Sequence, residues 1–504
     1  MKPHRNLHKN LHGNLHKSVL LVGLALMVGG AQAQQAQKYA GRTITLVTFD
    51  GPQIGEPLRR HAPEFEKLTG AKVNIVLTTF GDLFPRIYTD FTSGTNSFDG
   101  AVFDPQWLGD YVGGGYLEPL DSLIKKTPSL KWNEITPFFR NFSATYGGKT
   151  YTIPLDGDFQ MVYYRQDLWG DATYQKDFQA KYGYPLRPPR TWKEYRDMAE
   201  FFNGKTVGGK KIYGAVEAMA RNQQSYWILA SRAAGYMQYK GTSQGMFFDT
   251  NTMQPLVNAP GFVRALTEWK DIQKFAPPNI LNYGTGEVRN GYTKAGEAAL
   301  AVDWGDIGPL STDKDSVVKG KLGSVILPGS DEYWDRDSKK WVKMPAGRIN
   351  YAPYAAFGGW SGAVNAKSKN KDVMFDFLAF VSSPQNSDKD VTIGITGFNP
   401  YRTSHFKSTA IWEQSGMDKN DAQLYLGAIE ASLKSKNLVL DYRVPGAARY
   451  QSAMDVGVSE ALSGQKTPQQ ALDDVASEWN KITDDLGRQK QLAIYRSSLK
   501  LSTQ

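Results

Sequence analysis

Two aspartates, Asp156 and Asp158, flank a glycine in the apolar stretch YTIPLDGDFQMVYYRQDLW at 151–169. Side chains alternate along an extended strand, so both carboxylates lie on the same side of it. Such a pair can be the acid and base of a glycosidase, accept hydrogen bonds from sugar hydroxyls, or cap local structure. On one side of a strand they lie closer together than carboxyls that face each other across a glycosidic bond. This favours hydroxyl binding over catalysis.

Three tryptophans offer flat apolar faces that can stack on a sugar ring. Trp107, Trp304 and Trp360 each follow a predicted strand. An indole there can cover the C–H face of a sugar while carboxylates and amides bind the hydroxyls at its edge. Core packing is the alternative for each of them. Trp360 lies in GGWSG at 358–362, and glycines give a side chain little local cover, which favours a position in a cleft.

Other polar candidates lie in loops or at predicted strand ends. Asp306, two residues after Trp304, either accepts a hydroxyl or forms a turn. Asn399, in GFNP at 397–400, has the donor and acceptor that vicinal hydroxyls need, although an Asn before Pro also forms turns. Three further candidates lie at the carboxyl ends of predicted strands, where ligands of α/β sheets bind: Asp50, Phe80 and Asp104.

The composition excludes several kinds of chemistry. The chain has no cysteine, which excludes thiolate catalysis, Cys-ligated zinc, disulfides and lipid attachment through cysteine. Tyr163 and Tyr164 could bind ferric iron as a pair, but strand packing explains them better. The segment from Asp335 begins like a calcium loop and lacks the later ligand and glycine. We therefore expect no metal and no cofactor.

The N-terminus has the composition of a cleavable export signal. Residues 1–17 are basic and contain no acid, 18–30 are apolar, and AQA at 31–33 is a small-x-small cleavage pattern. The apolar run is too short to span a bilayer comfortably. Cleavage after Ala33 would leave His61 as one of two histidines, which argues against histidine chemistry. We expect a free periplasmic protein without a lipid anchor.

The charge distribution argues against a nucleic-acid partner. The formal charge is +9, and it falls to +5 when the four basic residues of the signal are removed. The remaining basic residues are scattered and form no cluster with interleaved aromatics. With 504 residues, of which 41% are hydrophobic, the chain is long enough for two lobes, each with its own core.

The predicted elements alternate between strand and helix. Strands are predicted at 42–50, 71–80 and 98–104, with GPQIGE after the first as a loop, and helices at 56–68 and 83–94. This order is typical of a parallel α/β sheet. Later patterns predict a strand crossing between lobes at 147–169, a helix capped by TWKE at 191–194, a strand at 321–329, a hairpin at 332–344, a strand and helix at 358–384, a helix at 468–486 and a final amphipathic helix.

Several segments together resemble the extracellular solute-binding proteins of ATP-driven importers, in the carbohydrate-binding branch that includes maltose-binding protein. They lie in family order behind the export signal: 151–169, PRTWKEY at 189–195, GEAALAVDWGDI at 296–307, GGWSGAVNAKSKNK at 358–371, GITGFNPYRTS at 394–404 and 444–475. The resemblance implies a two-lobed, type II α/β fold with crossing hinge strands. It also implies that Asp158 matches a position that commonly meets the ligand.

The resemblance further implies a non-catalytic protein that delivers a sugar or polyol to an inner-membrane ABC permease, acting as a monomer. We expect a signal at 1–33, a first lobe at 41–152 and 323–383, a second lobe at 153–322 and 384–486, and a helical tail at 487–504. Inserts around 170–188 and 330–345 depart from the family pattern. A secreted carbohydrate-active enzyme that uses Asp156 and Asp158, or the same fold binding an organic anion or peptide, are the alternatives.

Overall fold

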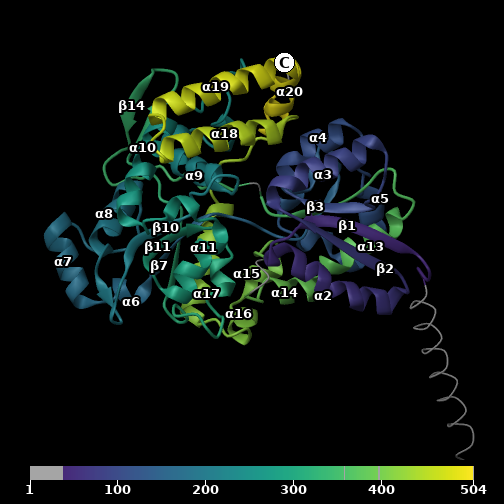
Figure 1. Cartoon of the computed structure of the whole chain (residues 1–504), viewed down its shortest axis with the longest axis horizontal. Coiled ribbons are helices and arrows are strands. Elements are labelled where there is room, and N and C mark those ends of the chain that lie inside the picture. Colours follow the sequence, from purple (N-terminus) through teal and green to yellow (C-terminus); the bar gives the residue numbers. More distant parts are fainter. Residues whose placement is uncertain (1–37, 357, 395–397, 503–504) are drawn as a thin grey trace, which may run out of the picture.

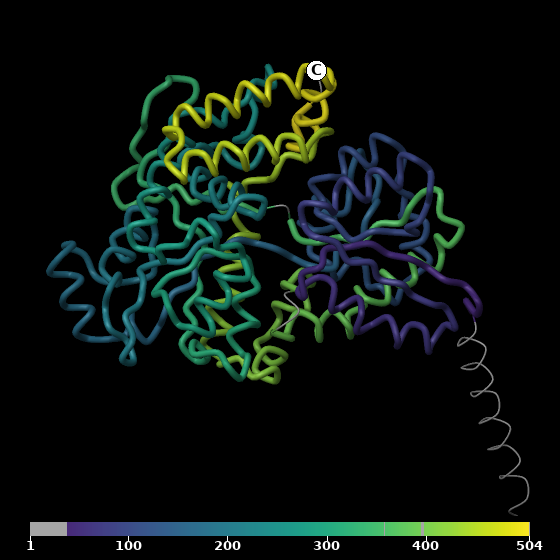
Figure 2. Tube along the Cα trace, in the orientation of Figure 1, coloured from purple at the N-terminus to yellow at the C-terminus, as the bar shows by residue number. Residues whose placement is uncertain are grey.

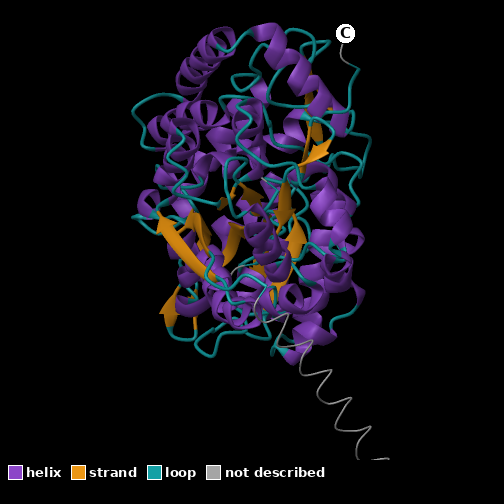
Figure 3. Ribbon diagram, turned by 90° about the vertical axis from the view of Figure 1, so that its right-hand side faces the viewer, coloured by secondary structure: helices purple, strands orange, loops and turns teal. Residues whose placement is uncertain are grey.

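The computed structural model describes residues 38–356, 358–394 and 398–502, so the predicted signal lies outside the described residues. Two lobes lie side by side and are joined by chain that crosses between them near the centre of the molecule (Figure 1). Each lobe has its own β-sheet, and helices surround the strands when the molecule is viewed from its side (Figure 3). Within the described residues, no helix is both long enough and apolar enough to cross a membrane.

The sheet of the first lobe has five strands in the order β2-β1-β3-β15-β6. β1 runs parallel to β2 and β3, while β15 runs antiparallel to β3 and β6. Their bounds are β1 Thr43–Phe49, β2 Lys72–Thr78, β3 Gly100–Phe103, β6 Thr152–Pro154 and β15 Ser361–Val364. The three strands predicted from the N-terminal part of the lobe are confirmed, and they form because β-branched residues alternate there or run on continuously.

Helices cover this sheet, and the first begins earlier than predicted. The helix α2 starts at Pro52, directly after Gly51. Proline is favourable at this position because the first residue of a helix does not need a backbone N–H for the helical hydrogen bonds. The predicted loop GPQIGE is therefore wrong. The helices of the first lobe are α2 Pro52–Thr69, α3 Phe80–Ser93, α4 Leu108–Gly113, α5 Asp121–Lys126, α13 Lys371–Val381, α14 Pro384–Asp390 and α15 Thr403–Lys407.

The sheet of the second lobe has four strands in the order β10-β11-β7-β12. β10 and β11 are parallel, while β7 runs antiparallel to both β11 and β12. Their bounds are β7 Met161–Arg165, β10 Tyr213–Glu217, β11 Ala298–Asp303 and β12 Leu322–Ile326. The helices of this lobe are α6 Gln166–Trp169, α7 Ala172–Tyr182, α8 Trp192–Phe202, α9 Ser225–Met237, α10 Pro260–Ile272, α11 Thr285–Asn290, α12 Ile307–Leu310, α16 Ala410–Gln414 and α17 Lys419–Leu433.

Three C-terminal helices lie on the second lobe and reach over the gap towards α4 (Figure 1). They are α18 Ala447–Leu462, α19 Pro468–Asp485 and α20 Arg488–Ser498, so the predicted helix at 468–486 and the final helix are confirmed. Thr467 and Gln470 form the predicted capping box at the start of α19. The predicted hairpin at 332–344 is also confirmed, as β13 Glu332–Asp335 and β14 Lys340–Lys343. Two shorter hairpins pair Thr145–Tyr146 with Lys149–Thr150 and Thr206–Val207 with Lys210–Lys211.

The chain crosses between the lobes at places that differ from the prediction (Figure 2). The single crossing strand predicted at 147–169 is divided, because β6 belongs to the first sheet, β7 belongs to the second, and Lys149–Thr150 before them forms a separate hairpin. The predicted return to the first lobe at 323 is wrong, because β12 pairs with β7 in the second sheet. The predicted departure at 384 is also too early, since Asp390 of α14 binds His61 of α2 at 2.9 Å.

Candidate functional site

Three stretches of chain meet where the lobes join. The backbone N–H groups of Leu155 and Asp156 donate to the carbonyl of Trp360 at 3.0 and 3.2 Å, and that of Gly157 donates to Asn399 at 3.2 Å. Gly359 has φ +82°, and a Cβ there would lie 1.9 Å from the carbonyl oxygen of Asp156. The glycine thus allows two crossing segments to pack backbone to backbone.

Asn399 holds the two aspartates of the crossing segment together. The backbone N–H of Asn399 donates to Oδ1 of Asp156, and its side-chain Nδ2 donates to Oδ1 of Asp158 at 2.7 Å. The hydroxyl of Tyr425, on α17, donates to Oδ1 of Asn399 at 3.3 Å. Asp156 and Asp158 therefore lie on one side of the chain as predicted, and one residue, Asn399, binds both through its backbone N–H and its side-chain amide.

Arg289, on α11, brings two further aspartates to the same place. Its Nε donates to Asp303 Oδ2 at 2.7 Å and its Nη2 to Asp306 Oδ2 at 2.8 Å. Asp303 ends β11, and Asp306 follows Trp304 in the next turn. We call Asp156, Asp158, Asp303 and Asp306 the cleft aspartates. Among the described residues, Asp156 and Asp158 form no ion pair with any lysine or arginine.

Burial raises the pKa of every cleft aspartate, because water does not solvate the charge. Burial raises the pKa of Asp156 to about 6 and that of Asp306 to about 7. The pKa of Asp158 is raised well above its usual value by burial first and then by the charges of Asp156 and Asp306. Carboxylates this close cannot all ionise, so the cluster retains a proton near neutral pH.

Aromatic rings from both lobes cover the cleft aspartates. Trp360 stacks on Phe49 with ring centroids 5.6 Å apart and planes at 10°. Phe80 packs edge-on against both of these rings, and it also contacts Trp227 of the second lobe at 5.9 Å. Trp227 meets Trp304 at 6.1 Å in an edge-to-face pair. Because rings of the two lobes touch, the lobes are closed against each other here.

The space beside the cleft aspartates is small. A cavity of about 20 Å³ is lined by aspartates and indoles from both sides of the junction, namely Asp156, Asp158, Trp304, Asp306 and Trp360. This volume holds about one water molecule. Trp304 is 1% exposed and Trp360 3% exposed, so a sugar reaches these residues only after the lobes separate.

A much larger cleft of about 1150 Å³ lies outside this cavity. Its walls are the N-terminal ends of α3 and α9 and the facing sides of α18 and α19. Asp50, Phe80 and Trp107 line it, and Phe49 lines both spaces. The helices α18 and α19, which the sequence placed in the second lobe, therefore form one wall of the mouth.

Eight of the ten candidate residues thus line one of the two spaces, and Asp104 and Asn399 line neither. Asp104 accepts a hydrogen bond from the backbone N–H of Gln106 at 2.8 Å and so caps the short 3-10 helix Pro105–Trp107. The sequence missed Trp227 and Arg289. Every residue of α9 is buried, so no local pattern separates Trp227 from the core around it.

A polar bridge links the lobes above the aromatic rings. Asp441 accepts from Gln106 Nε2 of the first lobe at 2.7 Å and from Trp227 Nε1 of the second lobe at 2.9 Å. Trp107 Nε1 donates to Gln451 of α18 at 3.1 Å. Burial raises the pKa of Asp441 to about 7. These contacts hold the closed arrangement without any contribution from a ligand.

The iron and calcium alternatives find no support among the described residues. The hydroxyl of Tyr163 donates to the carbonyl of Trp304 at 2.6 Å, and Tyr164 packs against Trp169. The described part of the chain contains no cluster of three or more histidine or acidic side chains suited to a metal ion. The tyrosine pair is therefore part of the packing of β7.

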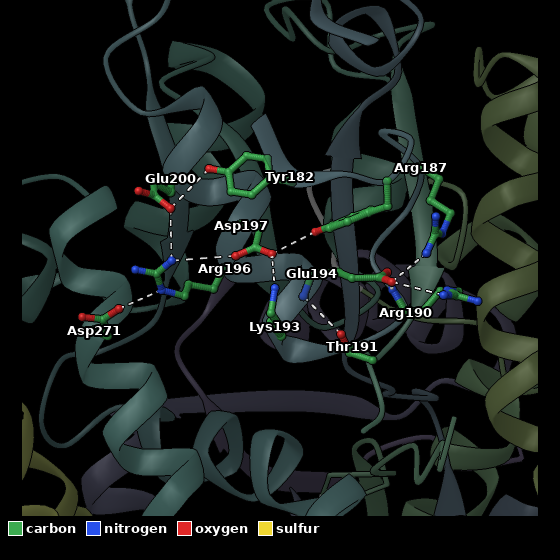
Figure 4. Close-up of polar contacts among 11 residues, drawn as sticks. Tyr182, Arg187, Arg190, Thr191, Lys193, Glu194, Arg196, Asp197, Glu200 and Asp271 are labelled. Atoms are coloured by element: carbon green, nitrogen blue, oxygen red, sulfur yellow. Dashed lines mark hydrogen bonds and ion pairs between the residues drawn. The ribbon is translucent and has the colours of Figure 1, made fainter. Parts of the chain in front are cut away.

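A second group of charged residues lies on α8 and on the chain packed against it (Figure 4), and none of them lines the cleft or the small cavity. Thr191 Oγ1 accepts from the N–H of Glu194 at 3.1 Å, so Thr191 caps α8 as predicted, while Glu194 binds the N–H of Arg190 instead of completing the box. We call the charged residues of this group the α8 network: Arg187, Arg190, Lys193, Glu194, Arg196, Asp197, Glu200 and Asp271. Each carboxylate of the α8 network forms an ion pair with at least one lysine or arginine.

Two α/β lobes with a cleft between them that is lined by indoles and carboxylates are typical of proteins whose lobes close around a small solute. Residues 50–388 match the bacterial extracellular solute-binding proteins, and the chain belongs to this family. It is a binding protein, not an enzyme.

Individual relatives agree with this membership. A probable ABC transporter-binding protein of Deinococcus radiodurans is 27% identical over 370 residues, which is 73% of this chain and 77% of the relative. The structure of a solute-binding protein of Agrobacterium radiobacter in complex with ribitol has a TM-score of 0.71 and 24% identity, and the match covers 88% of this chain and 100% of that one. A maltose-bound protein of T. maritima has a TM-score of 0.65 and 22% identity, with 88% and 100% covered. The predicted two-lobed fold is confirmed.

Proposed function

We propose that this chain captures a sugar or polyol between its lobes and delivers it to the permease of an ABC importer in the inner membrane. The carrying observation is that the stacked rings of Phe49 and Trp360 lie beside Asp156 and Asp158 where the lobes meet. Aromatic faces and charged acceptors together are what a sugar needs, because its rings are apolar on their faces and polar at their edges. The ribitol and maltose bound by the two similar structures support this ligand class.

The mechanism we propose is hinge closure. A ligand site typically has several hundred Å³, whereas the closed cavity at the cleft aspartates has about 20 Å³. The ligand therefore enters an open form and is enclosed when Phe80 and Trp227 approach each other again. A ligand drives this closure only in so far as it binds the closed form better than the open one.

The two alternatives fit the cleft less well. A glycosidase needs carboxyls on opposite sides of the scissile bond, whereas Asp156 and Asp158 both bind Asn399. An organic anion would meet repulsion from Asp50 and Asp455 in the outer cleft. Arg289 offers it little compensation, because two aspartates already occupy this side chain.

Location and oligomeric state form part of the same proposal. Export through the signal at 1–33, cleavage after Ala33 and release into the periplasm without a lipid anchor follow from the sequence pattern. We further propose that the chain acts as a monomer. N-terminal sequencing and light scattering of the purified periplasmic protein test both points.

A thermal-shift screen of neutral pentitols, hexitols, hexoses and maltodextrins tests the proposed function, with calorimetry to follow. A ligand at 100 to 1,000 times its dissociation constant should stabilise the protein by roughly 3–4 kcal/mol. Small-angle scattering with the best ligand measures whether the lobes separate without it and close around it. Hydrolysis of any compound, or the absence of binding by every compound, contradicts the proposal.

A further inference from the structure

The charges at the base of the cleft do not balance. Four aspartates lie there, and one cation, Arg289, contacts two of them. Asp156 is 1% exposed and Asp158 4% exposed, and neither forms an ion pair in the described part of the chain, although the charge of Arg289 acts on Asp158 from a longer distance. A buried carboxylate without a partner is costly, because it loses hydration and gains no opposite charge. An arrangement of this kind destabilises the empty protein unless a bound group supplies the charge.

One atom marks where such a group would bind. Oδ2 of Asp156 is buried and accepts no hydrogen bond from an N–H group or a hydroxyl of the described residues, while Oδ1 of the same side chain is bound by the N–H of Asn399. The side chains of Asp156 and Asp158 are hydrogen-bonded to each other, so the proton that the pair retains is shared within it. A ligand with an N–H donor there would bind both carboxyls and displace that proton.

The surrounding rings suit a cation better than a neutral hydroxyl alone. Trp304 and Trp360 line the same cavity as Asp156. The face of an indole attracts an ammonium group through its quadrupole, and the attraction grows when water is excluded. Trp360 is also stacked on Phe49, which fixes the orientation of its ring.

The outer cleft continues the same charge pattern. Its lining includes Asp50, Asp82, Asp455 and Glu478 but a single cationic residue, Arg449, and among the described residues no lysine lines either space. Arg449 is itself paired with Asp485 at 2.9 Å. The chain as a whole is basic, so this acidic path is a local property of the cleft and would guide a cation inward.

We infer that the ligand is a polyhydroxylated compound that carries a protonated amine, such as an amino sugar or amino alditol, with the ammonium group between Asp156 and Asp158 and under Trp360. This inference rests on the proposed function and narrows its ligand class. The hydroxyls would bind the remaining polar groups that line the cavity, among them Gln53 and Gln224.

Matched ligands test the inference on the full chain at pH 7. The first set is 1-amino-1-deoxy-D-glucitol, its N-acetyl derivative and D-glucitol. D-glucosamine, N-acetyl-D-glucosamine and D-glucose form the second. Isothermal titration calorimetry should show the free amine binding about 10- to 150-fold more tightly than the neutral compound, which is the range of one charge-assisted hydrogen bond. Acetylation keeps the nitrogen and removes its charge, so it should abolish the advantage.

Proton release gives a second, independent measurement. An alkyl ammonium is fully charged at pH 7, so the amino alditol should displace up to about one proton from the cleft aspartates when it binds. Titration in phosphate and in Tris, whose ionisation enthalpies differ, reports this number. D-glucitol should release none, because a neutral polyol does not need the pair to ionise.

Variants separate the charge from the fold. Asp156→Asn keeps the side-chain shape and the acceptor for Asn399, and it should reduce the preference for the amine to within about threefold. Asp337→Asn, on the hairpin turn with its side chain 77% exposed, is the matched control and should leave the preference unchanged. An Asp156→Asn protein that retains the full preference overturns the inference.

The outcomes distinguish this inference from the function on which it rests. Neutral sugars or polyols that bind as tightly as their amines overturn the amine inference and leave the proposed function in place. If compounds of neither kind bind in any of the sets, both are overturned. Tight binding of the amine with proton release supports both.

Discussion

The cleft aspartates and the α8 network each contain four carboxylates, and they differ in how many of these carboxylates have a cationic partner. In the α8 network, every carboxylate has at least one cationic partner within 4 Å (Figure 4). Most of its side chains are partly exposed to solvent. At the base of the cleft, one arginine contacts two of the four. Two acidic clusters of the same size therefore differ in whether the protein itself neutralises them.

The pKa values follow this difference. Burial opposes ionisation of Asp271, but the hydrogen bonds and charges of Lys274 and Arg196 together outweigh it and hold its pKa below the usual value. Burial raises the pKa of Asp156 instead. Folding thus favours the charged form of Asp271 and the protonated form of Asp156. The comparison teaches that charge balanced within the protein stabilises the fold, whereas unbalanced buried charge is kept for a partner.

The largest effect is expected from Trp360→Ala, which removes the cover from the cleft aspartates. Truncating a buried tryptophan costs about 3–5 kcal/mol, and the stack on Phe49 is lost. Water would then reach Asp156, so its pKa should fall towards that of an exposed carboxylate. Urea unfolding and calorimetry measure stability and affinity. Trp334→Ala, on the partly exposed hairpin, is the control that should keep affinity, and a Trp360→Ala protein that binds normally would show that Trp360 only packs the core.

Asp158→Asn should have opposite effects on binding and stability. The amide keeps an acceptor for Asn399 but loses the charge, so affinity for the best ligand should fall by about 10- to 150-fold. The ligand-free protein should become more stable at pH 7 by roughly 1–3 kcal/mol, because one buried, poorly neutralised carboxyl is gone. Loss of both binding and stability would mean that Asp158 is structural, and unchanged binding would remove it from the site.

The pH dependence of ligand-free stability should separate the two clusters. Asp156 and Asp306 have folded-state pKa values of about 6 and about 7, above the usual value, so the folded form binds more protons between pH 4 and 7. Their contribution to stability is therefore present at low pH and is lost as the pH rises through 6 to 7. The contribution of Asp271, with its lowered pKa, is lost in the opposite direction, as the pH falls below about 4.

Urea unfolding of wild type and Asp158→Asn between pH 4.5 and 7.5 measures this dependence. The difference in stability between them should grow in favour of the variant as the pH rises. A difference that stays constant across this range would show that the cleft aspartates do not titrate as a group.

The smallest effect is expected from Arg196→Gln in the α8 network. Arg196 contacts Glu200 and Asp271, and its side chain is 39% exposed, so removing the charge should cost about 1 kcal/mol or less. The loss should shrink further at high salt because exposed pairs are screened. Ligand affinity should not change. A loss of affinity in this variant would link α8 to the cleft and break the distinction between the two clusters.

Local patterns in the sequence were enough to predict most strands and the N-caps at Thr191 and Thr467, while the two-lobed class followed from chain length and the family resemblance. They failed where partners are distant in the chain. Nothing near Asn399 indicates that it binds Asp156 and Asp158, some 240 residues away. The strand at 322–326 has the same apolar pattern whichever sheet it joins, so the boundary at 323 was wrong. The start of α2 could have been predicted, because Pro52 is a residue that favours the first position of a helix, and the prediction of a loop there did not use it.

The sequence predicted which residues belong to the candidate site, but their contacts with one another could be seen only in the folded structure. Asp156, Asp158, Trp304, Asp306 and Trp360 do converge on one small cavity. The three aspartates among them have few cationic partners. This could not be predicted, because the sequence does not show that Arg289 lies beside them. Trp227 completes the aromatic cluster from α9, a helix that is buried along its whole length. The hydrophobic pattern of such a helix does not indicate which of its faces lies towards the cleft.

The rings that join the lobes also make the protein its own optical reporter. Trp227, Trp304 and Trp360 are buried at the junction, and the indole N–H of Trp227 is bound to Asp441. An indole emits at longer wavelength when its surroundings become polar and relaxed, so separation of the lobes should shift the emission of these three of the twelve tryptophans to the red. The open and closed populations can then be followed by fluorescence without attaching a dye.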